Sequence, residues 1–244
     1  MTAEQKERVA VFLDRAADFL RHGYKTPRGQ YDFKDREDVS APGAEAGDCL
    51  EKVAEAIAAC AGCGLAGTRT KTVPGEGVRR PLVVVVGEGP GAEEDAWGKP
   101  FVGNAGQLLT KMLGAIRLSR ERNCFILNVV KCRPPRNREP APEEIAACGP
   151  FLSRQIALLE PRAILCVGRT PARTLLKSAE PIGSLRGRFF EYAGIPLIAT
   201  YHPSALLRDQ SLKRPTWEDL KKLRDRLAAL DEGYAREARE SDAP

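Results

Sequence analysis

Three short polar clusters in this chain of 244 residues each adjoin an apolar run and hold side chains that can do chemistry. "GEGPG" carries Glu88 in a glycine loop, "NVVKC" carries Asn128, and "TYHPSALLR" carries His202, one of only two histidines. A carboxylate, an amide and an imidazole can exchange protons with a ligand or hydrogen-bond it. By itself, His202 is compatible with a catalytic group, a metal ligand or a core residue.

Four apolar runs rich in β-branched residues are placed to position these clusters. They span residues 81–87, 124–130, 163–168 and 195–200. Continuous apolar runs of this length are typical of parallel strands that are buried on both faces. Ligands bind beyond the carboxyl ends of the strands in such sheets, so we expect the three clusters to meet at one rim.

Helical patterns alternate with these runs and indicate the fold class. We expect helices over 48–59, 104–117, 142–158 and 170–178, and a last helix with Thr216 as its N-cap. Strands and helices in alternation predict an α/β fold, here a three-layer α/β/α domain with a central four-stranded parallel sheet.

The pattern also divides the chain into three parts. Residues 1–47 are predicted to form an N-terminal helical extension, with an amphipathic helix over 5–22 followed by a flexible linker rich in Pro and Gly. The α/β domain is predicted over 48–232. Residues 233–244 are predicted to form a polar, frayed tail.

The composition, with 43% hydrophobic and 29% charged residues, is that of a globular protein. No apolar run approaches the roughly 20 residues of a membrane-spanning helix, and the N-terminus lacks signal-peptide features. We therefore expect a cytoplasmic protein with no membrane partner. A net charge of +5 permits a polyanionic partner without establishing one.

Four of the seven cysteines are spaced as a metal-binding set. Cys60 and Cys63 form a C-x-x-C outside any predicted strand, Cys132 opens the proline-broken loop "CRPPRNREPAP", and Cys148 lies further along. Because a reducing compartment argues against disulfides, four thiolates on loops and helix ends indicate a Cys₄ centre. Their spacing does not distinguish zinc from an iron–sulfur cluster.

The other three cysteines have different surroundings. Cys124 and Cys166 fall within apolar runs and are expected to be core residues. Cys49 stands at the predicted domain edge and has no assigned role.

The glycine loop "VVVVGEGPGA" also fits the dinucleotide pattern G-x-G-x-x-A after a strand. Three features oppose a dinucleotide site. Glu88 would place a carboxylate in the phosphate cradle, and "EEDAWGKPFVG" stands where a helix should begin at once. The acidic residue expected at the end of a second strand is also missing.

Together, "CAGC", "GEGPGAEEDAWGKPFVGNAGQLL", "NVVKCRPPRNREPAPEEIAAC" and "YHPSALLR" resemble a family 4 uracil-DNA glycosylase, the iron–sulfur type of bacteria and archaea. The resemblance runs from about Cys60 to about residue 230. It implies a monomeric base-excision-repair enzyme of the bacterial or archaeal cytosol that acts on uracil-containing DNA. It also implies a structural [4Fe–4S] cluster held by Cys60, Cys63, Cys132 and Cys148.

Such an enzyme flips uracil out of the stack and cuts the bond between uracil N1 and deoxyribose C1′. The resemblance implies that Asn128 reads the base, Phe101 stacks on it, and the Gly89 backbone N–H bonds it. His202 then binds uracil O2 as negative charge develops there. Glu88 lies across the sugar, where both a general-base and an electrostatic role are compatible with it.

Further positions follow from the same resemblance. Gly91 stands where better-known relatives place a tyrosine that blocks the thymine methyl group, and Glu94 is the candidate for that exclusion here. Leu206, Leu207 and Arg208 are expected on a surface loop that enters the DNA, as apolar wedges do in other proteins. The candidates for phosphate contacts are Arg186, Arg188 and Lys213.

Two other functions are compatible with parts of the pattern. One is a relative that binds or covalently traps uracil-DNA without turnover, although the covalent branch uses a histidine in an added basic loop that is absent here. The other is a nucleotide-binding redox protein that uses the cluster and the glycine loop.

Overall fold

The computed structural model describes residues 48–240, with side chains described as far as Arg236. The helix predicted over 5–22, the linker to residue 47 and the last four residues lie outside the described residues. Within the described part, no helix is both long enough and apolar enough to cross a membrane.

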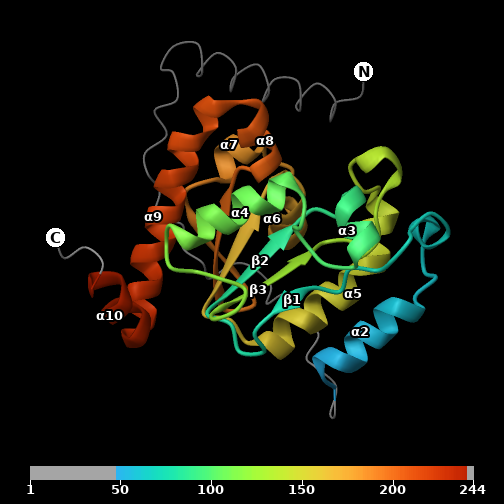
Figure 1. The fold of residues 1–244 in the computed structure, drawn as a ribbon, viewed down its shortest axis with the longest axis horizontal. Helices are drawn as coiled ribbons and strands as arrows, with labels where there is room; N and C mark the ends of the chain where they lie inside the picture. The colour runs from blue at the N-terminus through green and yellow to red at the C-terminus, as the bar shows by residue number, and fades with distance from the viewer. Residues whose placement is uncertain (1–47, 241–244) are drawn as a thin grey trace, which may run out of the picture. The chain divides into compact units, whose positions relative to one another are not determined.

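The described residues form one six-stranded sheet in the order β1-β3-β2-β4-β6-β5 (Figure 1). In chain order the strands are β1 Glu76–Gly77, β2 Val83–Gly87, β3 Cys124–Asn128, β4 Ala163–Val167, β5 Phe189–Tyr192 and β6 Ile195–Thr200. The four predicted strands are confirmed as the parallel centre, formed by β3, β2, β4 and β6.

The prediction of a sheet with only four strands is wrong at both edges. There β1 pairs antiparallel with β3, and β5 pairs antiparallel with β6. Strand β5 alternates between exposed and half-buried residues, as an edge strand does when one face meets solvent. Every residue of β2, β3 and β4 is buried, which explains their continuous apolar sequences.

Helices cover both faces of the sheet, so the three-layer α/β/α prediction is confirmed (Figure 1). One core contains residues of α5 Pro142–Leu159 and α6 Arg169–Leu176. The other contains residues of α4 Asn104–Gly114, α8 Pro203–Arg208 and α9 Lys213–Leu230. The remaining described helices are α2 Leu50–Ala59, α3 Ala92–Trp97, α7 Ile182–Leu185 and α10 Glu232–Glu240, with short 3₁₀ turns at Gly64–Gly67, Pro135–Asn137 and Gln210–Leu212.

The strand register brings the predicted site segments together. Gly87 at the end of β2 lies opposite Asn128 at the end of β3. Val167 at the end of β4 lies opposite Thr200 at the end of β6, two residues before His202. Parallel strands that end side by side place all of these segments at one edge, the carboxyl rim.

Two helix predictions near the C-terminus need correction. Helix α9 begins at Lys213, so Thr216 is inside its first turn and its hydroxyl donates to the Leu212 carbonyl. Residues 232–240 form α10, where a frayed tail is predicted. Tyr234 is buried there and donates its hydroxyl to the Ile116 carbonyl, which ties α10 to the end of α4.

Candidate active site

One pocket of about 310 Å³ lies at the carboxyl rim. All five residues predicted to bind uracil or act on it line this pocket: Glu88, Gly89, Phe101, Asn128 and His202. They come from the ends of β2 and β3, the segment between α3 and α4, and the start of α8. A volume near 300 Å³ is at the lower end of the range for small-molecule sites and suits a single base.

Asn128 is the most informative of these side chains. It is 1% exposed, and its Oδ1 has no hydrogen-bond partner among the described residues. A buried acceptor without a donor is costly, so this oxygen is placed to accept a proton from a bound ligand. Its position depends on Gly87, where a Cβ would lie 2.3 Å from Asn128 Oδ1 and 2.6 Å from the Phe101 ring. The sequence points to Gly87 only as the first glycine of the dinucleotide pattern, and not as a neighbour of Asn128.

Gly89 follows on the same loop. A Cβ there would lie 2.8 Å from a methyl group of Val130, so the loop packs directly against the chain after β3. The Gly89 N–H has no recorded acceptor within residues 48–240. It is therefore free to donate to a ligand in the pocket.

Phe101 is buried and adopts a left-handed backbone with φ of 53°. This conformation is uncommon for a bulky residue and is held from outside the pocket. The guanidinium of Arg120 donates to the carbonyls of Phe101 and Pro100, at 3.1 Å each, and to Glu76 Oε2 at 2.7 Å. The Phe101 ring faces the His202 ring at a centroid distance of 5.8 Å, so the two rings border the same space.

His202 is the N-cap of α8, and its Nδ1 accepts the Ser204 backbone N–H at 3.2 Å. Because a backbone N–H can only donate, Nδ1 carries no proton, and the neutral ring carries its proton on Nε2. The pKa of His202 is lowered to about 4, mainly by burial and also by the charge of Arg208, against the opposing charge of Glu94. His202 is thus a neutral Nε2–H donor at neutral pH.

Glu88 is held by a neutral donor. Thr170 is buried in the first turn of α6, and its hydroxyl donates to Glu88 Oε2. The same hydroxyl oxygen lies 3.1 Å from Glu139 Oε1, and Glu139 pairs with Arg169 at 2.6 Å. Sequence reasoning missed Thr170, since only the fold brings β2 beside α6.

Glu94 also lines the pocket, and both of its oxygens accept backbone hydrogens. Oε2 accepts the Gly91 N–H at 3.0 Å at the start of α3, the half of a capping box that a glycine N-cap allows. Oε1 accepts the N–H groups of Val102 and Gly103, at 2.9 and 3.0 Å. Glu94 therefore joins the glycine loop to the segment that carries Phe101.

Helix α3 corrects one argument about the glycine loop. A helix does begin at Ala92, directly after the loop, where the sequence indicated none. Its first turn holds Glu93, Glu94 and Asp95. Three acidic residues at a helix N-terminus oppose phosphate binding, so the case against a dinucleotide site stands on different grounds.

The three residues predicted to enter DNA lie in α8 rather than in a loop, and they do not share one environment. Leu206 is 2% exposed and packs in the core with α9, so the prediction that it reaches DNA is not compatible with its position. Leu207 is 47% exposed, and Arg208 is exposed and lines the pocket. The helical phase that separates the two leucines cannot be seen in a segment predicted as a loop.

Two of the three residues predicted to contact phosphates instead contact other side chains of the protein. Arg186 donates from Nε and Nη2 to the two oxygens of buried Asp219, at 2.9 and 2.6 Å, and its guanidinium lies over the Tyr201 ring. Arg188 lies over the Phe190 ring and 3.8 Å from a Glu180 oxygen. Lys213 is exposed at the start of α9.

The four cysteines predicted as a set line one small cavity away from the pocket, with Arg69 and Lys131 also in its wall. They come from the end of α2, the loop after β3 and the middle of α5. Among residues 48–240, no three His, Cys, Asp or Glu side chains form a group able to hold a metal ion. The donor set itself, four thiols without imidazole or carboxylate, is the one that iron–sulfur clusters use.

Several N–H groups point at these sulfur atoms. Arg69 Nη1 lies 3.2 Å from Cys132 Sγ, and the Lys131 backbone N–H lies 3.4 Å from Cys148 Sγ. Burial raises the pKa of Cys132 and Cys148, while these donors and nearby positive charge oppose the rise. By contrast, Cys124 and Cys166 are buried within strands, as predicted, and burial raises the pKa of Cys124 to about 12.

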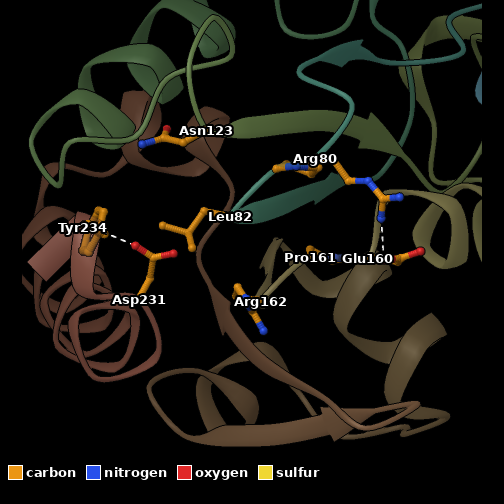
Figure 2. Close-up of a pocket in the computed structure, with 10 residues that line it drawn as sticks. Arg80, Leu82, Asn123, Glu160, Pro161, Arg162, Asp231 and Tyr234 are labelled. Atoms are coloured by element: carbon orange, nitrogen blue, oxygen red, sulfur yellow. Dashed lines mark hydrogen bonds and ion pairs between the residues drawn. The ribbon is translucent and has the colours of Figure 1, made fainter.

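A larger cavity, of about 610 Å³, lies at the opposite, amino ends of the strands. Figure 2 shows Arg80 paired with Glu160 across it, and Asp231 bonded to Tyr234 of α10. Asn123 is also satisfied, accepting from the Ser119 N–H and donating to the Arg117 carbonyl. None of the residues predicted to act on a ligand lies in this cavity.

Comparisons with known proteins show the family. Residues 74–221 match the model of the uracil DNA glycosylase superfamily. The chain is 42% identical to a type-4 uracil-DNA glycosylase of Sulfurisphaera tokodaii, over 77% of this chain and 88% of that protein. It is 45% identical to the type-4 enzyme of Thermotoga maritima, over 72% and 93%, and 33% identical to a type-5 enzyme of Pyrobaculum aerophilum, over 65% and 76%.

The match covers the sheet, the carboxyl-rim pocket and two of the four cysteines of the cavity, Cys132 and Cys148. The sequence motifs, the pocket and the relatives agree, and the chain belongs to the uracil DNA glycosylase superfamily, among the type-4 uracil-DNA glycosylases.

Proposed function

We propose that this protein removes uracil from DNA by hydrolysing the bond between uracil N1 and deoxyribose C1′, which leaves an abasic site for base excision repair. The observation that carries the proposal is the buried, unpartnered Oδ1 of Asn128 in a pocket of base size.

Asn128 reads the base in this proposal. Its Oδ1 accepts from uracil N3–H and its amide nitrogen donates to uracil O4. Cytosine carries no proton on N3 and an amino group at C4, so both contacts become unfavourable. Phe101 stacks on the flipped base, a contact that is worth about 1–3 kcal/mol in other base–aromatic pairs. The Gly89 N–H adds a further hydrogen bond to the base.

His202 stabilises the leaving group. As the C1′–N1 bond breaks, its electron pair passes to the uracil ring, and the Nε2–H donates to uracil O2. A neutral donor that is already in place needs no reorganisation as the charge develops. The α8 cap contact with Ser204 keeps the proton on Nε2 throughout.

Glu88 serves the sugar side. Its carboxylate stabilises the positive charge that develops at C1′ and orients the water whose oxygen forms the new bond there. The proton that this water releases neutralises the departing uracil anion. Glu94, fixed by three backbone N–H groups, is the proposed block to the thymine methyl group.

Leu207 and Arg208 face the duplex in this proposal. Leu207 fills the space left by the flipped base, as apolar wedges do in other DNA-distorting proteins, and Arg208 contacts a phosphate beside the pocket. Exposure of Leu207 and burial of Leu206 support the choice between the two leucines.

A [4Fe–4S] cluster held by Cys60, Cys63, Cys132 and Cys148 completes the proposal. The cluster supplies a structural link and no step of the bond cleavage: it joins the end of α2 to α5 and to the loop after β3. In a Cys60→Ser variant we expect loss of visible absorbance and of bound iron. Cys49→Ser, outside the cavity, is the matched control and should keep both.

One incubation tests the function. The protein is mixed with a labelled oligonucleotide containing one uracil, single- or double-stranded, and then treated with alkali. Strand cleavage at uracil, and none at thymine in the same sequence, is the expected result. A stable protein–DNA adduct would favour a trapping relative instead, and an unchanged oligonucleotide would exclude both activities.

A further inference from the structure

Thr170 stands where two carboxylates meet, and the proposed chemistry has not used it. Its side chain is 3% exposed, in the first turn of α6 directly after the end of β4. Its hydroxyl oxygen is within hydrogen-bond distance of Glu88 Oε2 and, at 3.1 Å, of Glu139 Oε1. A threonine hydroxyl has one proton, and an ionised carboxylate only accepts, so one of the two receives it.

The surroundings decide which carboxylate receives the proton. Glu139 already has a charged partner, because Arg169 Nη2 lies 2.6 Å from its other oxygen. Glu88 forms no ion pair with any residue in the described range, and its contact with Thr170 is the shorter of the two. The Thr170 proton therefore goes to Glu88, while Glu139 keeps the Arg169 guanidinium away from it.

This arrangement has a chemical consequence for Glu88. A neutral donor fixes one carboxylate oxygen and leaves the negative charge in place. An arginine or lysine in the same position would cancel much of that charge. The second oxygen has no hydrogen bond among the described residues, and Glu88 lines the pocket in which a flipped nucleotide would lie. A carboxylate that stabilises the positive charge developing on the sugar needs both a fixed orientation and its own negative charge.

We propose that Thr170 is a positioning residue, which orients the Glu88 carboxylate toward the deoxyribose during uracil excision. The inference rests on the proposed function, and it adds a residue that acts only through Glu88.

The test compares single-turnover cleavage of a uracil duplex by the full chain and its Thr170→Val and Thr170→Ser variants. Valine keeps the β-branched shape without the hydroxyl, and serine keeps the hydroxyl. We expect Thr170→Val to be slower by about tenfold to a hundredfold, the effect of losing a hydrogen bond to a charged group. Thr170→Ser should recover most of the rate. Binding to a duplex with uncleavable 2′-fluorodeoxyuridine should not change.

Thr174→Val is the matched control. It makes the same substitution one turn along α6, where the hydroxyl donates only to the Thr170 backbone carbonyl at 2.8 Å. Its cleavage rate should equal that of the unmodified chain. Equal thermal unfolding of the two valine variants would show that a loss of rate in Thr170→Val is not a loss of fold.

A double-variant cycle with Glu88→Gln separates positioning from a merely structural role. If Thr170 acts through Glu88, Thr170→Val should slow the Glu88→Gln protein by less than about twofold. An equal slowing in both backgrounds would overturn the inference, as would an unmodified rate in Thr170→Val. Both outcomes leave the proposed function intact, whereas an unmodified chain that fails to cleave uracil removes the function and this inference with it.

Discussion

The two ends of the central strands hold cavities of opposite character. The amino-end cavity is the larger, at about 610 Å³ against about 310 Å³, but most of its polar groups are satisfied within the protein. Arg80 pairs with Glu160, and the Asn123 amide has both of its partners. At the carboxyl rim, Asn128 Oδ1 is unpartnered within the described residues.

This difference shows that volume does not identify the site here. A cavity whose hydrogen-bonding groups are paired internally offers a ligand little that water does not offer already. A smaller pocket that leaves a buried acceptor unpaired gains that hydrogen bond when a complementary ligand enters. If the comparison holds, substitutions at the two ends should separate catalysis from stability.

The largest expected effect is a loss of cleavage rate that separates Asn128 from Asn123. Asn128→Ala should slow uracil cleavage by about 10²–10³-fold, because the base loses its reader at the reacting centre. Its free energy of unfolding should not fall, because the variant removes an unsatisfied acceptor. Asn123→Ala should cleave normally but lose about 1–3 kcal/mol of stability, since two part-buried hydrogen bonds are lost. Cleavage assays and urea unfolding check both, and a reversed pattern would refute the comparison.

The second expectation concerns pH and His202. We expect the ratio of cleavage rates between the unmodified chain and His202→Ala to stay constant from about pH 8 to pH 5 and to change only near pH 4, because the pKa of the ring is about 4. A ratio that grows as the pH falls from about 7 to 5.5 would mean that a charged imidazolium does the work instead.

Stability should depend on pH in the same window. The unfolded ring takes up a proton near pH 6.5 and the folded ring only near pH 4, so the unfolded chain binds more protons between these values. The contribution of His202 to folding therefore weakens as the pH decreases from 6.5 toward 4. The dependence should be absent from the His202→Ala variant.

A smaller effect should separate the two leucines of α8. Leu207→Ala should weaken binding to a uracil duplex by about tenfold, since apolar wedges hold a base step open, and should matter less for single strands. Leu206→Ala should instead lose about 2–5 kcal/mol of folding stability, as buried leucines do. Fluorescence anisotropy measures DNA binding and thermal unfolding measures stability. A DNA-binding defect in Leu206→Ala alone would contradict the assignment of Leu207 as the wedge.

The smallest effect is expected at the amino-end cavity. Arg80 and Glu160 are 72% and 66% exposed, so their ion pair contributes at most about 1 kcal/mol. Arg80→Ala should therefore leave both cleavage and unfolding nearly unchanged. Slower uracil cleavage in this variant would show that the larger cavity takes part in the function.

The sequence predicts the centre of the fold better than its edges. The central strands appear as continuous apolar runs because both of their faces are buried. Strand β1 has two residues, Glu76 and Gly77, and β5 alternates, so neither produces such a run. Helix α10 is short and polar, and its burial depends on Tyr234 meeting the Ile116 carbonyl, a contact between distant parts of the chain.

The same distinction applies to the site. Residues within motifs, such as Asn128 and His202, could be predicted because each motif contains its own chemistry. The roles of Gly87 and Thr170 could not be predicted, because they depend on what the fold places against each residue. Gly87 lies against Asn128 Oδ1 on the neighbouring strand β3, and Thr170 lies against Glu88 at the end of β2. Leu206 was misplaced for a related reason, since its burial depends on the phase of a helix.

Free uracil tests the central contrast most directly. With the side-chain amides labelled with ¹⁵N, nuclear magnetic resonance follows Asn128 and Asn123 during a titration with the base. We expect the Asn128 signals to shift with saturation and those of Asn123 to stay in place. Shifts at Asn123 with an unmoved Asn128 would contradict the account and place the uracil site at the amino ends of the strands.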